Sequence, residues 1–184
     1  MTKINKKHLM INKTKNMNLN QAIKFIEKQI KDPKVGLPEE VFLFISRITP
    51  LVNVDLLIQD ENGRTLLSWR DDIHGAGWHI PGGIIRFKEH LEDRLKKVAI
   101  KEIGTEVKFD QTPIAFNEII LKHKNRGHFM SFLYKCFLPS SFVPKNLGLK
   151  ETDKGYLKWH DFCPSNLIKV HGIYKKFICK YEDK

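Results

Sequence analysis

The sequence predicts a mixed α/β (α+β) protein, an α/β/α sandwich with a mixed central sheet. Two observations carry this prediction. Strand-like apolar runs stand on both sides of one amphipathic helical segment, and further helical segments stand towards the two ends of the chain. The 184 residues, 41% of them hydrophobic and 29% charged, suffice for one domain around one core.

Residues 1–37 are expected to be a basic N-terminal tail followed by an extra helix. Five lysines and no acid occur in the first 16 residues, a composition typical of a solvated tail. Apolar residues at helical spacing then predict a helix from Leu19 to about Lys31. Two roles stay open for this helix, a dimer element or a lid on the sheet, so a homodimer is one expectation. Residues 38–184 are expected to form the main domain.

The main domain begins with a short helix from Pro38, which is followed by a change to strand-like patterning. Residues Leu51–Ile58 and Thr65–Arg70 flank an Asp-Glu-Asn-Gly turn, which predicts a β-hairpin. The remaining expected elements are a loop over Asp71–Gly77, a helix over Glu89–Ile103, strands over Pro113–Leu121 and Phe129–Leu138, a short strand around Tyr156–Trp159, and a helix over Ile173–Glu182.

The net charge of +11 raises the question of nucleic-acid binding. The basic residues are spread along the chain and are not interleaved with aromatic residues, so we expect no nucleic-acid partner. No apolar run is long enough to span a bilayer and no secretory signal begins the chain, which predicts a cytoplasmic protein without a membrane partner. Three cysteines without metal-ligand spacing are expected to be free thiols: Cys136, Cys163 and Cys179.

The segment from Gly83 to Gly104 carries the most specific pattern in the chain. Gly83 is followed after five residues by Glu89, and after seven more by Lys97-Val98-Ala99-Ile100-Lys101-Glu102-Ile103-Gly104. A glycine turn lets a backbone carbonyl approach a hard cation, and a carboxylate from the next helix completes the oxygen shell. This spacing resembles the Nudix box, whose second half reads Arg-Glu-apolar-x-Glu-Glu-x-Gly.

The resemblance implies a Nudix-type sandwich and a Mg²⁺ site, with Mn²⁺ as an alternative ion. Lys97, Val98 and Lys101 replace the Arg and two of the three clustered Glu residues of the box, so Glu102 is the one acid kept there. In the GDP-mannose mannosyl hydrolase branch the same two acids are absent. Four further segments resemble that branch: Thr49–Asp55, Leu66–Arg70, Trp78–Gly83 and Val170–His171.

Likeness to this branch implies a hydrolase that releases sugar and GDP from GDP-mannose or a similar nucleotide diphosphate sugar. The implied metal ligands are the Gly83 carbonyl and Glu102, and Arg70 is the implied clamp on the diphosphate. Ile84 stands where the branch has an Arg, and Arg86 lies two positions on. The remaining substrate-contact candidates are Asp55, Arg86, His128 and His171.

One departure concerns the loop from Lys150 to Gly155, where the branch carries a Gln-His pair. This loop has no His, so Asp153 is the candidate metal ligand, and either Glu151 or Asp153 is the candidate general base. Two other functions stay open: ordinary Nudix attack on phosphorus of a nucleoside diphosphate derivative, and a catalytically inactive nucleotide-binding module. A simpler reading also stays open for Glu89, Glu92 and Lys96, as ion pairs on a solvated helix face.

Overall fold

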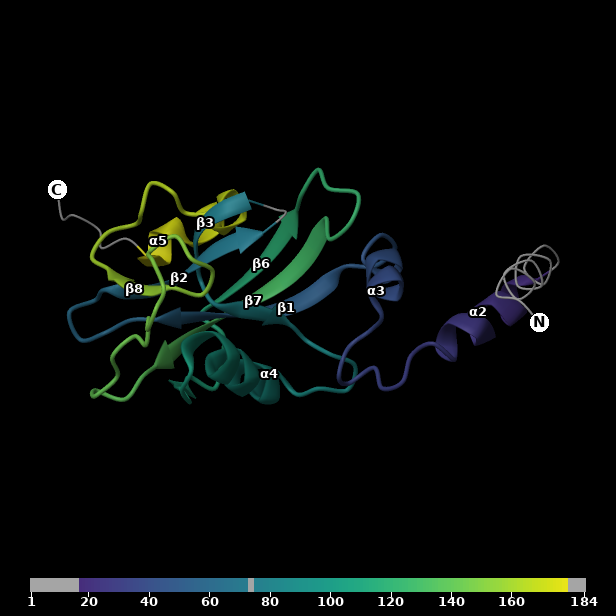
Figure 1. Cartoon of the computed structure of the whole chain (residues 1–184), viewed down its shortest axis with the longest axis horizontal. Coiled ribbons are helices and arrows are strands. Elements are labelled where there is room, and N and C mark those ends of the chain that lie inside the picture. Colours follow the sequence, from purple (N-terminus) through teal and green to yellow (C-terminus); the bar gives the residue numbers. More distant parts are fainter. Residues whose placement is uncertain (1–16, 73–74, 179–184) are drawn as a thin grey trace.

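The computed structural model describes residues 17–72 and 75–178 and contains two sheets (Figure 1). The expectations for the tail, for Cys179 and for a helix reaching Glu182 fall outside the described residues. The first sheet has the order β4-β1-β7-β5, with β6 also paired to β7, and the second has the order β3-β2-β8. The strand bounds are β1 Leu51–Ile58, β2 Thr65–Asp72, β3 Gly75–His79, β4 Gly82–Ile84, β5 Lys108–Phe109, β6 Ala115–Ile120, β7 His128–Phe137 and β8 Leu157–His160.

The central sheet is mixed, as predicted. Strands β1 and β7 run parallel over eight paired positions, and all the other strand pairs in both sheets are antiparallel. The predicted hairpin of β1 with β2 is wrong, because the two strands lie in different sheets and meet only at an isolated bridge between Gln59 and Thr65. Both edges of β1 are already taken by β4 and β7, so the turn at Asp60–Gly63 leads the chain into the second sheet.

Helices cover the sheets from two sides, which confirms the sandwich. Helix α4 (Leu91–Val98) continues as a π-helix, η1 (Ala99–Ile103), where the sequence predicts one uninterrupted helix. The 3₁₀ helix η2 (Lys169–Tyr174) and α5 (Lys175–Ile178) lie on the side of the second sheet (Figure 1). Alternate side chains of β1 point to opposite faces of the sheet. Val54, Leu56 and Ile58 pack against α4, whereas Leu57 packs against α5 and the second sheet.

The N-terminal helices contribute little to the two core clusters. Helix α2 (Leu19–Glu27) starts with a capping box between Asn18 and Gln21, ends earlier than predicted, and buries none of its residues. It lies apart from the sheets in Figure 1, whereas α3 (Glu39–Ile45) lies next to them. No helix in the described ranges is both long and apolar enough to cross a membrane.

Candidate metal and phosphate site

A glycine turn connects the two sheets at the centre of the candidate site. The chain leaves β3, and Gly82 and Gly83 then pair with β1 at its residues Asp55 and Val54. Backbone hydrogen bonds of 2.8 and 2.9 Å join β1 to Pro81 and Ile85 on either side of the glycines. Hydrogen-bonded pairs alternate along an antiparallel ladder, so the Gly83 carbonyl is turned towards β1. The register therefore favours Gly82 over Gly83 as the carbonyl open to a cation.

The Asp55 carboxylate supports this turn from inside the protein. Its side chain is 3% exposed, and Oδ2 accepts hydrogen bonds from Tyr174 Oη (2.5 Å), Asn53 Nδ2 (3.0 Å) and Ser131 Oγ. A Cβ on Gly82 would overlap Oδ1 of Asp55, so only glycine fits there. Burial raises the pKa of Asp55 to about 6, against the lowering effect of the three hydrogen bonds. A direct contact of Asp55 with substrate stays a prediction.

The π-helix presents Glu102 to the end of β3. The wider turn is closed by a 3.0 Å hydrogen bond from the Gly104 amide to the Ala99 carbonyl, and π-turns are frequent at functional sites. Oε2 of Glu102 lies 3.4 Å from Nε2 of His79 and is buried with no hydrogen-bond partner. A buried carboxylate oxygen without a partner is costly, so this atom suits a bound cation. Lys101, its neighbour in sequence, is exposed.

The donor set fits one metal ion. Within residues 17–72 and 75–178, no group of three or more His, Cys, Asp and Glu side chains is placed to hold a metal. One carboxylate and a backbone carbonyl would therefore be supplemented by water or substrate oxygens. Mg²⁺ is commonly bound in this way, since it retains several waters and uses one or two carboxylates plus phosphates.

Glu89 is not part of a solvated helix face. Its side chain is 3% exposed, and Oε2 accepts hydrogen bonds from Arg94 Nε and from the Arg86 amide, each at 2.8 Å. Lys97 Nζ lies 2.8 Å from Oε1. Burial raises the pKa of Glu89, but the bonds from Lys97, Arg86 and Arg94 outweigh it and bring the pKa down to about 2. Glu89 thus fixes the loop between the glycine turn and α4.

Arg70 lies near the end of β2 in positively charged surroundings. Its Nε donates to Oδ2 of Asp72 at 2.6 Å, which orients the guanidinium. Burial and the nearby charge of Arg70 both lower the pKa of Arg126, in the loop between β6 and β7. The Gly155 amide donates to the Trp69 carbonyl at 2.8 Å, so the loop that carries the candidate bases runs beside Arg70. This arrangement suits an anion such as a diphosphate.

The two candidate bases each have a partner, one within that loop and one in the adjoining strand β8. Oδ2 of Asp153 accepts the Lys150 amide at 2.8 Å, and Oε1 of Glu151 accepts Lys158 Nζ at 2.8 Å. No hydrogen bond or ion pair joins either acid to Glu102 in the part of the chain that the structure describes. The roles of Asp153 as ligand and of either acid as base therefore stay predictions.

The two histidines singled out from the sequence lie in different places. His171 is buried, and its Nδ1 accepts the Ile80 amide at 3.0 Å, directly behind the glycine turn. Burial, followed by the charges of His79 and Arg70, lowers the pKa of His171 well below its usual value, so it is neutral. His128 instead pairs with Glu118 at 3.1 Å on neighbouring strands β7 and β6.

Arg86 and His79 complete the surroundings of the turn. The Arg86 guanidinium lies close to Gly36, so it faces the segment between α2 and α3. His79 received no role from the sequence, although the structure places it against Glu102. The sequence could have indicated His79 by its position inside the Trp-x-x-Pro-Gly-Gly segment, three residues before the first glycine.

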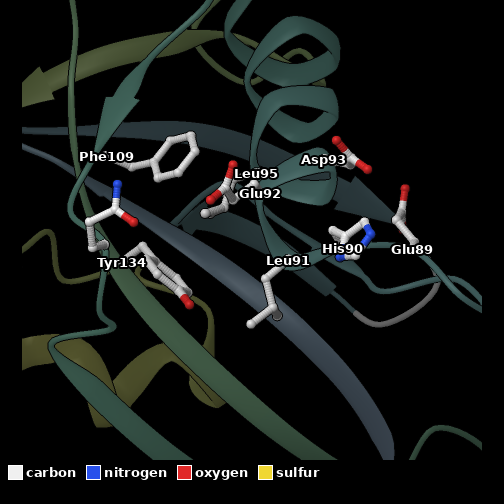
Figure 2. A pocket seen from close by; sticks show the side chains of 9 residues that line it. Glu89, His90, Leu91, Glu92, Asp93, Leu95, Phe109 and Tyr134 are labelled. Atoms are coloured by element: carbon white, nitrogen blue, oxygen red, sulfur yellow. The ribbon is translucent and has the colours of Figure 1, made fainter.

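A cavity of about 600 Å³ lies elsewhere, at the start of α4 (Figure 2). Figure 2 shows the side chains of α4 facing Phe109 and Tyr134 across it. Glu92 on its rim pairs with Lys96 at 3.9 Å, and both side chains are exposed, as the simpler reading of this helix face predicted. Neither Glu102 nor Arg70 lines this cavity, so it is not the predicted catalytic site.

Comparisons with known proteins identify the fold. No family model matches the chain. A MutT Nudix hydrolase from Burkholderia pseudomallei superimposes with a TM-score of 0.55 at 20% identity, over 71% of this chain and 98% of that one. A possible asymmetric diadenosine tetraphosphate hydrolase from Jonesia denitrificans gives a TM-score of 0.54 at 19% identity, over 71% and 92%. A Nudix-family hydrolase from Clostridium perfringens gives 0.52 at 16% identity, over 71% and 97%. The chain therefore has the Nudix fold.

One curated relative is similar in sequence over part of its length. It is the low-salt glycan biosynthesis protein Agl8 of Haloferax volcanii, 38% identical over 80 residues. The matched segment covers 43% of this chain and about half, 51%, of that relative.

Proposed function

We propose that the protein is a metal-dependent Nudix-type hydrolase that acts on a nucleotide diphosphate sugar, such as GDP-mannose or a similar GDP-sugar. One observation carries the proposal most directly. Oε2 of Glu102 is buried without a hydrogen-bond partner. Glu102 belongs to the helix that follows the glycine turn, and its Oε2 lies 3.4 Å from Nε2 of His79, at the end of the strand before the turn. A helical carboxylate and a glycine carbonyl are oxygen donors of the kind that Mg²⁺ and Mn²⁺ prefer.

Each part of the site then has a distinct role. Glu102 and a carbonyl of the glycine turn, with Gly82 favoured over Gly83, would hold the ion, and Asp153 is the proposed further ligand. When bound, the ion stabilises the negative charge that develops on the diphosphate leaving oxygen. Arg70, oriented by Asp72, binds phosphate oxygens of the same group.

Two features favour attack at the sugar carbon. A site with one box acid suits a single ion that serves the leaving group, and the name of the similar Haloferax protein places that relative in glycan biosynthesis. In the proposed reaction a water oxygen bonds to the anomeric carbon as the bond from that carbon to the diphosphate oxygen breaks. Asp153 or Glu151 accepts the proton of the water.

Attack on phosphorus is the second candidate. The similar Nudix hydrolase structures favour it as the ordinary outcome for this fold. It would give a nucleoside monophosphate and a sugar phosphate instead of free sugar and a nucleoside diphosphate. A third candidate, nucleotide binding without turnover, is favoured by Val98, which packs in the core where the box usually has an acid.

A product analysis in ¹⁸O water separates these candidates. We would incubate the full-length protein with a panel of nucleotide diphosphate sugars and Mg²⁺ or Mn²⁺, and analyse the products by mass. The proposal expects ¹⁸O in free sugar. Turnover should be lost in Glu102→Gln and should stay at the wild-type rate in the exposed control Glu106→Gln. Label in a phosphate product would instead establish attack on phosphorus. Binding by calorimetry without turnover of any sugar would establish the binding module.

A further inference from the structure

His79 lies opposite the proposed metal carboxylate. It is the last residue of β3, where it pairs with Ser68 of the buried strand β2. Its Nε2 lies 3.4 Å from Oε2 of Glu102, and the two side chains are 15% and 25% exposed. An N–H···O hydrogen bond is usually about 2.9 Å long and is shorter when charge-assisted, so the two atoms face each other without a good hydrogen bond.

The surroundings hold this pair in place. The backbone next to His79 is anchored by the Ile80 amide, which donates to the buried Nδ1 of His171 at 3.0 Å. On the other side, Glu102 is carried by a π-turn closed at Gly104. The ring centroids of His79 and His171 are 6.0 Å apart, so the buried imidazole of His171 lies next to that of His79. Both donor atoms therefore sit on well-fixed elements.

The spacing of the two atoms suits a shared cation. Two ligand atoms that bind one ion at about 2.1 Å each lie about 3.0 Å apart in an octahedral site and about 3.4 Å apart in a tetrahedral one. The distance from His79 Nε2 to Glu102 Oε2 is 3.4 Å. Buried polar atoms of both side chains also lack hydrogen-bond partners, namely Oε2 of Glu102 and Nδ1 of His79. No ion pair joins Lys101 to Glu102 in the described part of the chain, so its ammonium does not compete for the carboxylate.

We propose that His79 is a nitrogen ligand of the divalent cation that Glu102 binds, a proposal that rests on the metal-dependent function above. The site then has a mixed nitrogen and oxygen donor set instead of an all-oxygen one. Imidazole nitrogen binds first-row transition ions with an affinity that rises from Mn²⁺ to Co²⁺, whereas Mg²⁺ is held by oxygen ligands. The protein therefore prefers Co²⁺, and to a smaller extent Mn²⁺, over Mg²⁺, and His79 is the source of that preference.

Pulsed electron paramagnetic resonance of the Mn²⁺-loaded full-length protein tests the nitrogen directly. The protein is labelled with ¹⁵N only at histidine, and the spectrum is expected to show coupling from one directly bound imidazole. The coupling is lost in His79→Gln and kept in His90→Gln, a control at an exposed histidine beside Glu92 and Asp93. Mn²⁺ affinity in His79→Gln falls at least by the ten- to hundredfold typical of losing an outer-shell partner, while Mg²⁺ affinity changes less.

The outcomes separate this proposal from the function on which it rests. If Mn²⁺ binds, is lost in Glu102→Gln and shows no imidazole coupling, His79 is not a ligand, whereas the metal-dependent hydrolase stands. Coupling that disappears in His90→Gln instead also overturns the assignment. If the wild-type protein binds Mg²⁺ but no Mn²⁺, the assignment of His79 alone fails, and if it binds neither ion, both proposals fail. If His79→Gln does not fold, His79→Asn takes its place, and a wild-type spectrum without imidazole coupling overturns the proposal by itself.

Discussion

The phenol of Tyr174 donates a 2.5 Å hydrogen bond to Oδ2 of Asp55, which ties the C-terminal 3₁₀ helix to the first strand. The other oxygen of the same carboxylate faces Gly82. A single buried acid thus links the end of the described chain to the turn on which the candidate site is built. The buried neutral His171, which accepts the Ile80 amide, supports the turn from the same 3₁₀ helix.

Asp55 should make stability fall with rising pH. Its pKa is about 6 in the folded protein and about 3.8 in the unfolded chain, so between these values the folded state holds a proton that the unfolded state has lost. The free energy of unfolding therefore falls as pH rises from about 4 to about 6. Asp55→Asn cannot ionise and should lack this fall. Denaturant unfolding at several pH values measures it, and a pH-independent difference between the two proteins contradicts the assignment.

Glu89 should have the opposite effect in acid. Its pKa is lowered to about 2, so its stabilisation is complete above about pH 4.5 and is lost as pH falls towards 2. Glu89→Gln leaves Arg94 without its partner and should cost about 3 kcal/mol at neutral pH. Glu92→Gln is the matched control, because the exposed pair with Lys96 contributes less than about 1 kcal/mol. Equal losses in the two variants would show that Glu89 is only a surface acid.

Gly82→Ala should disturb both the fold and the site. Its Cβ would overlap Asp55 Oδ1 and lie 2.9 Å from the Val54 carbonyl oxygen, so a strand must shift. Overpacking of this kind costs about 1–3 kcal/mol. Gly172→Ala is the control, since a Cβ there meets no atom within 4 Å. Thermal melting of both variants checks this, and a Gly82→Ala protein as stable as wild type contradicts the tight approach.

Arg70→Lys should weaken turnover of the proposed nucleotide-sugar substrate while keeping the charge. A lysine cannot bind two phosphate oxygens with a planar fork, so kcat/KM should fall on the order of a hundredfold. Arg64→Lys is the matched control, because Arg64 bonds Asp60 at 2.7 Å much as Arg70 bonds Asp72 at 2.6 Å. Steady-state kinetics with the substrate found in the screen gives the comparison. Equal rates for the two variants would remove Arg70 from the site.

The sequence predicted most of the fold because its long elements have strong patterns. Strand β1 was predicted with the observed bounds, since a mostly apolar run between a proline and an Asp-Glu-Asn-Gly turn is a clear signal. The strands Gly75–His79 and Gly82–Ile84 were missed, because glycine-rich segments carry no hydrophobic alternation. The hairpin of β1 and β2 was wrong for a different reason. Local turn chemistry does not reveal that other strands already occupy both edges of β1.

The candidate site was only partly predictable, since motif spacing locates backbone positions and not side-chain partners. The box spacing indicated Glu102 and the glycine turn, but it gave no reason to expect His79 opposite that acid. Glu89 was left open as a surface residue because its partners Arg94 and Lys97 look like ordinary helix-face charges until their geometry is known. Which glycine carbonyl faces outward also depends on the strand register, which the sequence does not specify.

Calorimetric titration of Mn²⁺ into the substrate-free protein addresses the central claim most directly. We expect one ion per chain for the wild type and for Glu106→Gln, and loss of that binding in Glu102→Gln, because this carboxylate is the site's one box acid with a buried oxygen lacking a partner. Unchanged Mn²⁺ affinity in Glu102→Gln would contradict the account, since the ion would then be bound elsewhere in the molecule.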